Sequence, residues 1–505
     1  MKITRKHFIS FTAVFVIVLT AIGQQVDQAA RFATLITEEG LRDKLTILAS
    51  DALEGRMTGT RGQKMAAAFI EHHFREIGLS GPVNGAYQQH VPLMQTTPGE
   101  TYIQSGNDRF ENFKDFFLPA ILKTDGIQSA PAVFVGMGTN EELTQVDIQN
   151  KVVVVLLPDI KMETIFSSGR LVKALKDKGA LAIVLAPECN EQEFDQLNVS
   201  MKEWFGRGSL TLAGSSPGGM NAFVVRPAMA EKLVKTSFGK LKEAAQKKQL
   251  KKIKENRINW SATYATKEVS SENVLGYLEG TDKKDEFIII TAHFDHIGTN
   301  PDGPDKVNNG ADDDGSGTSA VMQLAEAFAE AKKQGHGPKR SILFMTVTGE
   351  EEGLFGSEWY VTHPVFPLQK TVVDLNIDMI GRTDPNHASD KNYVYAIGSD
   401  KLSMELHQLH EQINSQYTKL TLDYTYNDQN HPEQLYYRSD HWNFAKNNIP
   451  IIFYFDGIHE DYHKPSDEVS KIEFDILKKR TELVFHTAWA LANRENRLKA
   501  DSAGK

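Results

Sequence analysis

From Val274 to Asn493 the chain alternates short, continuously apolar runs with amphipathic stretches. Residues 286–292 and 341–348 have the length and composition of strands that are buried on both faces. Residues 317–333 and 474–493 show the spacing of apolar side chains that predicts helices. This alternation predicts an α/β fold, in which a mixed and mostly parallel sheet is sandwiched by helices.

A second alternation of strands and helices precedes this one. Residues 151–158 and 180–186 predict buried strands, and residues 171–178 predict a helix between them. We therefore expect residues 128–265 to form a smaller inserted α/β domain. Residues 24–127 would be the N-terminal part of the main domain, which residues 266–505 would complete. A chain of 505 residues is long enough for such an insertion.

The first residues have the pattern of an export signal. Lys2, Arg5 and Lys6 precede an apolar run over residues 8–22, and a small residue stands at Gly23. The run is shorter than the ~20 apolar residues that a membrane span needs. We expect residues 1–23 to be a signal peptide and the mature chain to have no stable membrane span. The protein would then be exported, to the periplasm or the extracellular space.

Composition excludes several classes of function. Lys and Arg number 56 against 66 Asp and Glu, which gives a net charge of −10, and residues 247–254 form the one basic run. This balance argues against nucleic acid as a partner. The single cysteine, Cys189, excludes an intrachain disulfide and a cysteine-based zinc or iron–sulfur site.

Residues with metal-binding or acid–base side chains follow four predicted strands, at residues 286–292, 341–348, 371–377 and 451–455. They are His293 and Asp295, then Glu350, Glu351 and Glu352, then Asp378, and finally His459 and His463; Asp312, Asp313 and Asp314 lie between the first two strands. Because sites in open α/β sheets form beyond the carboxyl ends of the strands, we expect a single site. Two histidines and three or four carboxylates suit two divalent ions, of which zinc fits best. The ligands outnumber the needs of one ion, which favours a catalytic two-metal site.

Each motif alone has a simpler interpretation. A His-x-Asp triplet occurs often by chance, and a run of glutamates is typical of a helix start. The aspartate run could be a calcium loop, but Gln323 stands at the twelfth position, where a bidentate Glu is needed. The prediction of a two-metal site therefore depends on all the motifs together.

Together these motifs resemble the two-zinc aminopeptidase family, which also includes glutamate carboxypeptidase, glutaminyl cyclase and the transferrin receptor ectodomain. The resemblance covers about residues 270–495, and the region 128–265 resembles the protease-associated insert of many members. It rests on Thr291-Ala-His293-Phe-Asp295, Gly310-Ala-Asp312-Asp313-Asp314-Gly-Ser-Gly, Glu350-Glu351-Glu352-Gly-Leu-Phe-Gly-Ser357, Asn376-Ile-Asp378-Met379, Arg438-Ser-Asp440-His441 and Tyr462-His463-Lys-Pro-Ser-Asp467.

The resemblance implies a role for each residue of the site. His293 and Asp378 would bind one zinc ion, Glu351 and His463 the other, and Asp312 would bridge both, with a cis peptide between Asp312 and Asp313. Asp295 would orient the imidazole of His293, and Glu350 would be the general base. A donor for the oxyanion or the substrate would come from Tyr436, Tyr437 or His441.

The implied function is that of a secreted two-zinc exopeptidase that hydrolyses peptide substrates, with an aminopeptidase as the favoured activity. The alternatives on the same fold are a carboxypeptidase or dipeptidase, a glutaminyl cyclase, and a non-enzymatic binding protein. The presence of Glu350 beside the metal ligands argues against the last, because a binding protein has no need of a base there.

Overall fold

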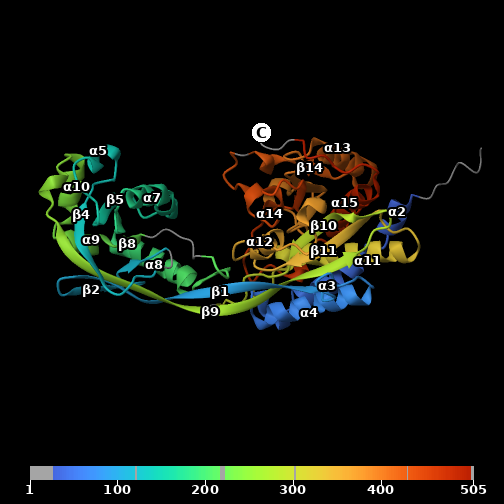
Figure 1. Ribbon diagram of the computed structural model, residues 1–505, viewed down its shortest axis with the longest axis horizontal. Coiled ribbons are helices and arrows are strands. Elements are labelled where there is room, and N and C mark those ends of the chain that lie inside the picture. Colours follow the sequence, from blue (N-terminus) through green and yellow to red (C-terminus); the bar gives the residue numbers. More distant parts are fainter. Residues whose placement is uncertain (1–26, 120–121, 216–221, 301–302, 429, 502–505) are drawn as a thin grey trace, which may run out of the picture. The chain divides into compact units, whose positions relative to one another are not determined.

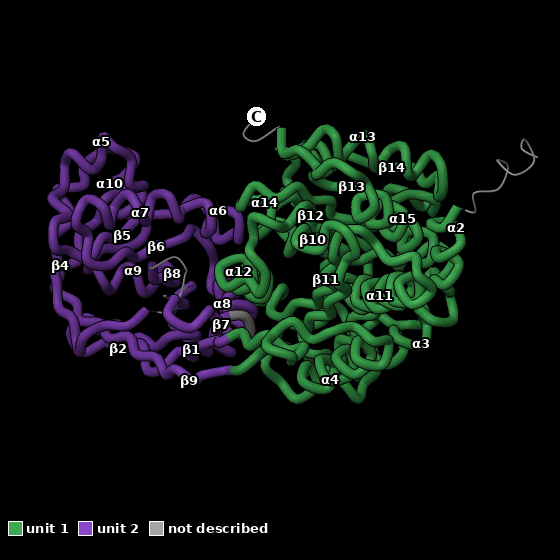
Figure 2. Tube along the Cα trace, turned by 45° about the vertical axis from the view of Figure 1, so that its right-hand side comes forward, with its two compact units in different colours: residues 1–91, 270–505 green, residues 92–269 purple. Residues whose placement is uncertain are grey.

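The computed structural model describes residues 27–119, 122–215, 222–300, 303–428 and 430–501. The predicted signal peptide lies outside these residues. The chain forms two compact units, Met1–Val91 with Ser270–Lys505, and Pro92–Val269 (Figure 2). No helix among the described residues is long and apolar enough to cross a membrane.

The first unit is built on a mixed sheet. Its strand order is β14 (Thr421–Asp423), β13 (Tyr393–Ile397), β15 (Ile451–Phe455), β12 (Thr371–Ile377), β10 (Lys283–His293), β11 (Arg340–Val347) and the last part of β9 (Asn256–Leu278). The four central strands β15, β12, β10 and β11 are parallel. Strands β9 and β13 pair antiparallel with their central neighbours. The prediction of a mixed, mostly parallel α/β sheet is therefore confirmed.

Helices cover both faces of this sheet (Figure 1). Ile288 and Ile290 of β10 pack in one apolar cluster with α2 (Gln28–Ala33), α3 (Glu38–Leu48), α4 (Arg61–Glu76), α11 (Gly317–Lys333), α13 (Met404–Ile413) and α15 (Phe474–Asn493). Ile289 packs in another with α12 (Phe355–Thr362) and α14 (His441–Ala445). Side chains of a strand alternate between its faces, so burial on both faces accounts for the continuous apolar runs in the sequence.

Short helical turns connect these elements. They are η1 (Asp51–Arg56), η3 (Ala311–Ser316), η4 (Leu368–Lys370), η5 (Pro385–His387), η6 (Asn414–Thr418), η7 (Thr425–Asn427), η8 (Leu435–Tyr437) and η9 (Val469–Lys471). Turn η3 contains the three consecutive aspartates and leads directly into α11.

The strands of the second unit pair onward from the first part of β9, and apolar clusters lie on both of their faces. The first part of β9 is followed in the sheet by β4 (Gln128–Phe134), β5 (Val152–Leu157), β6 (Ala182–Pro187), β8 (Phe223–Val225) and β3 (Phe116–Phe117), and β1 (Gln88–Ser105) pairs with β2 (Asp108–Glu111) and β7 (Ser209–Leu212). Its helices are α5 (Asn140–Leu143), α6 (Met162–Ser167), α7 (Gly169–Asp177), α8 (Glu191–Gly206), α9 (Pro227–Val234), α10 (Phe238–Gln246) and the turn η2 (Leu250–Lys252).

This inserted unit is larger than the predicted range 128–265. It begins at Pro92 because strands well upstream of residue 128 complete its sheet. Phe116 of β3 pairs with Val225, and Leu93 of β1 pairs with Leu212. These partners lie more than a hundred residues away in the chain, so no local pattern marks residues 92–127 as part of the insert.

Candidate active site

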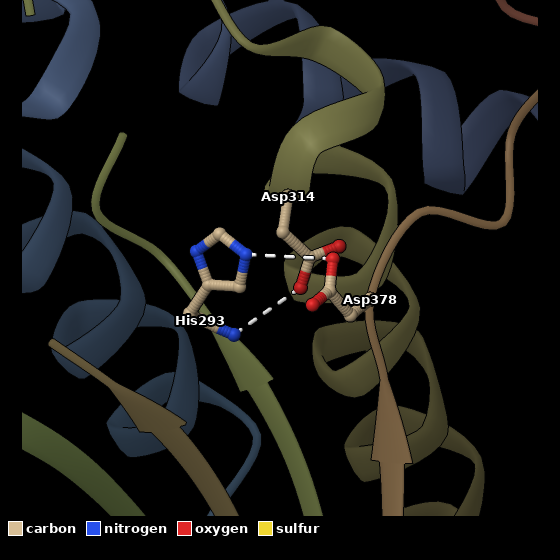
Figure 3. A group of neighbouring side chains, drawn as sticks. All are labelled: His293, Asp314 and Asp378. Carbon is tan, nitrogen blue, oxygen red and sulfur yellow. Dashed lines mark hydrogen bonds and ion pairs between the residues drawn. The ribbon is translucent and has the colours of Figure 1, made fainter. Parts of the chain in front are cut away.

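Five of the predicted site residues lie at the carboxyl ends of the central strands. His293 is the last residue of β10, and Asp378 directly follows β12. His293 Nε2 lies 3.5 Å from Asp378 Oδ1 (Figure 3). Glu350 and Glu351 follow β11, and His463 lies in the loop after β15. Parallel neighbours deliver these side chains to one edge of the sheet, as expected.

Asp314 completes a first group with His293 and Asp378, whose ligand atoms all lie within 4.8 Å of one another. Its carboxylate is occupied by backbone N–H groups. Oδ2 accepts from His293 N at 3.1 Å (Figure 3). Oδ1 accepts from Gly317 N at 2.9 Å and from Met379 N at 3.1 Å. Asp314 therefore holds the backbone of the neighbouring strand ends, which leaves His293 and Asp378 as the available ligands.

A second group consists of His296, Asp313 and Glu351, and His463 contacts it. His463 Nε2 lies 3.0 Å from Glu351 Oε2. His296, which the sequence analysis did not single out, is buried and its Nδ1 lies 2.7 Å from Glu351 Oε1. The two oxygens of Glu351 thus face two imidazoles.

Asp313, and not Asp312, lies between the two groups. Its Oδ1 is 3.3 Å from His293 Nε2, and its Oδ2 is 3.1 Å from His463 Nε2. Asp312 points elsewhere, since its Oδ1 accepts from Gly381 N at 2.7 Å and its Oδ2 lies 3.1 Å from His459 Nε2. The assignment of Asp312 as the bridging residue is therefore wrong by one position.

The cis peptide also lies one residue further along the chain than predicted. It joins Asp313 to Asp314, and not Asp312 to Asp313. Turn η3 departs from helical geometry at Asp313 and Asp314, and this irregular backbone decides which of three identical side chains faces the two histidines.

Asp295 orients His293 through a different atom from the one expected. His293 Nδ1 lies 3.1 Å from the backbone oxygen of Asp295 and 3.9 Å from its carboxylate. The carboxylate instead accepts from Thr58 Oγ1 at 2.7 Å and from Glu350 N at 3.3 Å. An Nδ1–H donated to a carbonyl group leaves Nε2 free as a ligand.

Glu350 lines a cavity together with Asp313, Glu351 and Asp378. Burial raises the pKa of the Glu350 carboxyl group well above its ordinary value, and the nearby carboxylates of Asp378 and Glu351 raise it further. A carboxyl group whose pKa is shifted toward neutrality in a cavity is suited to proton transfer.

The excess of negative charge at this edge fits divalent cations. Although burial opposes the charged form of His463, its contacts with Asp313 and Glu351 raise the pKa of this imidazole to about 10. His296 Nε2 is buried and makes no hydrogen bond among the described residues. Imidazole nitrogens and carboxylate oxygens that converge in this way are the ligand types that zinc prefers.

The three candidates for an oxyanion donor do not line this cavity. His441 is buried, its Nε2 contacts the backbone oxygen of Tyr436 at 2.8 Å, and its ring stacks on Phe453. Tyr437 is exposed. Tyr462 is the tyrosine that lines the cavity, and its proximity to His463 in the sequence could have marked it. The geometry thus gives no support to Tyr436, Tyr437 or His441 in that role.

Two further residues, which were not predicted, form hydrogen bonds with the backbone of the loops that carry the metal ligands. Asp467 accepts hydrogen bonds from the backbone N–H groups of Asp312 and Asp313. Arg56 is fully buried and donates to the backbone oxygens of Leu48, Phe294, Asn309 and Gly310. Arg56 thus connects the loop that follows β10 with the loop that precedes η3.

We expect Arg56→Met to lower the free energy of unfolding by at least about 2 kcal/mol, because it leaves several buried carbonyl groups without a donor. Urea denaturation of the metal-free protein measures this change. Arg61→Met is the matched control, since Arg61 is exposed and pairs with Glu54 at the surface. Equal stability of the two variants would contradict a bracing role for Arg56.

Comparison with known proteins agrees with this geometry. Residues 273–488 match the model of peptidase family M28. This region belongs to peptidase family M28. The match contains every residue of the two ligand groups and ends within α15.

Curated relatives of this chain include aminopeptidases. Aminopeptidase YwaD of Bacillus subtilis is 30% identical over 154 residues, which cover 27% of this chain and 31% of that protein. A probable leucine aminopeptidase of Arthroderma benhamiae is 28% identical over 217 residues, which cover 42% and 55%. The chain therefore spans about a third of the first of these two relatives and little more than half of the second.

Solved structures are similar over nearly the whole chain. An aminopeptidase from Aneurinibacillus sp. strain AM-1 has a TM-score of 0.57 at 18% identity and covers 94% of this chain and 98% of its own. A zinc aminopeptidase from Bacillus subtilis has a TM-score of 0.53 at 19% identity and covers 92% and 98%. At these identities the likeness concerns the fold.

Proposed function

We propose that the protein is a metallo-aminopeptidase that uses two divalent ions, best zinc, to remove N-terminal residues from peptides. The observation that carries this proposal is the position of Asp313, whose two carboxylate oxygens face His293 on one side and His463 on the other. His293 and Asp378 would hold one ion, Glu351 and His463 the other, and Asp313 would contact both. Membership of the M28 region and the aminopeptidases among its relatives support it.

When bound, the two ions would supply Lewis acidity to the scissile carbonyl group and to the attacking water. The residues of the chain supply the rest of the chemistry. Glu350 accepts a proton on its carboxylate from the attacking water and returns it to the departing amine. The Asp295 carboxylate accepts from Glu350 N and so holds the base at the end of β11.

The cavity favours an apolar side chain next to the scissile bond. Besides the acidic residues, it is lined by Met379, Leu435, Phe453, Phe455 and Ile458. Arg438 also lies there, but it donates to Glu433 at 2.9 Å. The positive charge of Arg438 is compensated by Glu433, so Arg438 is poorly suited to bind a free C-terminal carboxylate. This argues against a carboxypeptidase and favours an aminopeptidase.

We expect the purified protein to carry close to two zinc ions per chain. A chelator should abolish peptide hydrolysis while leaving the circular dichroism spectrum largely unchanged, because the helices and the sheet bury their own core. Elemental analysis and activity after re-addition of zinc test this. Trace metal only, with no activation by zinc or cobalt, would overturn the proposal.

The choice of terminus is tested with a panel of dipeptides that carry an apolar first residue. Substrates with a free amino group and an amidated carboxyl group should be hydrolysed, whereas N-acetylated substrates with a free carboxyl group should not. The opposite preference would indicate a carboxypeptidase. Formation of pyroglutamate from N-terminal glutamine, without hydrolysis, would indicate a glutaminyl cyclase.

We further propose that the protein acts outside the cytoplasm after removal of residues 1–23, and that the inserted unit is a protease-associated domain. The charged residues that precede an apolar run at the N-terminus support the first point. The parallel strands β4, β5, β6 and β8 with covering helices support the second. N-terminal sequencing of the mature protein from a cell fractionation tests the location.

A further inference from the structure

Polar side chains line one face of two neighbouring strands beneath the candidate metal site. On β10, Thr291 lies two residues before His293; on β12, Asp374 and Asn376 precede Asp378 at the same spacing. Alternate residues of a strand share a face, and Thr291 pairs with Asn376 in the parallel register of the two strands. All of these side chains therefore lie on the face covered by α14, where apolar packing would be the norm.

Hydrogen bonds connect these side chains in a line that ends on a metal ligand. Thr291 Oγ1 lies 2.9 Å from Asp374 Oδ1 and 2.7 Å from Asn376 Oδ1. Asn376 Nδ2 donates to Ser439 Oγ at 3.0 Å. Ser439 Oγ, which lies just before α14, donates to Asp378 Oδ2 at 2.6 Å. All five residues are buried.

The number of hydrogens that each side chain can donate determines which group is the donor in each of these hydrogen bonds. Ser439 has one hydroxyl hydrogen, which it donates to the Asp378 carboxylate, so its oxygen accepts from Asn376. The Asn376 amide therefore presents its oxygen to Thr291, which donates its own single hydrogen there. The contact between Thr291 and Asp374 is then left without a hydrogen unless Asp374 supplies one.

Asp374 can supply that hydrogen as a neutral carboxyl group. Its Oδ2 has no hydrogen-bond partner among the described residues, and no cation contacts it there, so an ionised form would be a buried and uncompensated charge. Burial raises the pKa of Asp374 well above its ordinary value, in agreement with a retained proton.

We propose that Asp374, Thr291, Asn376 and Ser439 form a directed hydrogen-bond chain that positions Asp378 for metal binding, with Asp374 as its protonated first member. This hydrogen-bond chain occupies Asp378 Oδ2 and so leaves Asp378 Oδ1 facing His293 Nε2, 3.5 Å away. All four are positioning residues, and none lines the cavity. This inference rests on the proposed metal site and adds how one of its ligands is held.

The hydrogen-bond chain is tested by variants that remove its hydrogen bonds at different points. Ser439→Ala removes the donor to Asp378, and Thr291→Val removes the central hydroxyl group at nearly constant volume. Thr291→Ser restores the hydroxyl group, and Asp374→Asn replaces the neutral acid with an amide that can still donate. The matched control is Thr481→Val, a buried threonine of α15 whose hydroxyl group donates to Leu477 O of the same helix.

Zinc binding to metal-free protein is measured by competition with a chromophoric chelator, and unfolding temperature is measured with and without zinc. We expect Ser439→Ala and Thr291→Val to weaken one of the two zinc sites about tenfold or more, as supporting residues of metal ligands do. The rise in unfolding temperature that zinc causes should shrink accordingly. Thr291→Ser, Asp374→Asn and the control should remain within about threefold of the wild type, well below that loss.

The outcomes separate this inference from the proposed function. If the wild type binds no zinc, the metal site itself is wrong. If the wild type binds two ions and Ser439→Ala and Thr291→Val bind them equally well, the chain does not position Asp378. A loss in Asp374→Asn as large as in Thr291→Val would overturn the protonated state of Asp374. If Thr291→Val fails to fold, Ser439→Ala decides, because it removes only the single hydroxyl group that donates to Asp378.

Discussion

Glu350→Gln should lower kcat by at least ~10²-fold, because general acid–base catalysis is worth about 10²–10⁴. Glutamine keeps the size of the side chain and its polar character, but it cannot accept the proton of the attacking water. Zinc content should remain near the wild-type value, since Glu350 belongs to neither of the two ligand groups. Steady-state kinetics on a free dipeptide amide and elemental analysis of the same preparation measure both effects.

The neighbouring Glu351→Gln is the matched comparison. Glu351 faces both His296 and His463, so its replacement should weaken one metal site and make activity depend on added zinc. If Glu350→Gln lost metal while Glu351→Gln retained it, the roles of the two glutamates would be exchanged. If neither variant affected hydrolysis, the active site would lie elsewhere.

Asp313→Ala should remove activity more completely than any other single change at the metal site. Because its two oxygens face His293 and His463, loss of this side chain should weaken the binding of both ions. We therefore expect kcat/KM to fall by more than ~100-fold, which is the upper range for residues that only support a metal ligand. Elemental analysis should show that fewer than two ions remain. The fold should persist. The circular dichroism spectrum, which reports the helices and the sheet, should therefore remain close to that of the wild type.

Asp312→Asn distinguishes the two neighbouring aspartates. Asp312 contacts Gly381 N and His459, so an amide in its place should leave both ions bound and reduce their affinity by at most about tenfold. If Asp312→Asn lost both ions while Asp313→Ala kept them, the bridging position would be Asp312 after all.

The position of the site could be predicted from the sequence because it depends on local patterns. Continuous apolar runs identify central parallel strands, and the carboxyl ends of such strands meet at one edge. His293, Glu351, Asp378 and His463 therefore had to be neighbours once the runs before them were recognised as strands. The distances among them agree with this reasoning.

Other features depend on contacts that are remote in the sequence. Three consecutive aspartates are equivalent as a pattern, and only the irregular backbone of η3, held by Asp467, turns Asp313 toward both histidines. Arg56 shows no local signal, because its acceptors are backbone oxygens up to 254 residues away.

The chemistry of the catalytic region was thus determined by the residue types at the strand ends, since strand periodicity is local and each strand delivers its last residues to a known edge. Which oxygen of which carboxylate faces a metal was decided only by tertiary structure. The hydrogen bond of Ser439 to Asp378 and the extension of the inserted unit to Pro92 are of the same kind. Each results from pairing between distant segments, and the free energy of such pairing depends on burial and geometry that no window of the sequence contains.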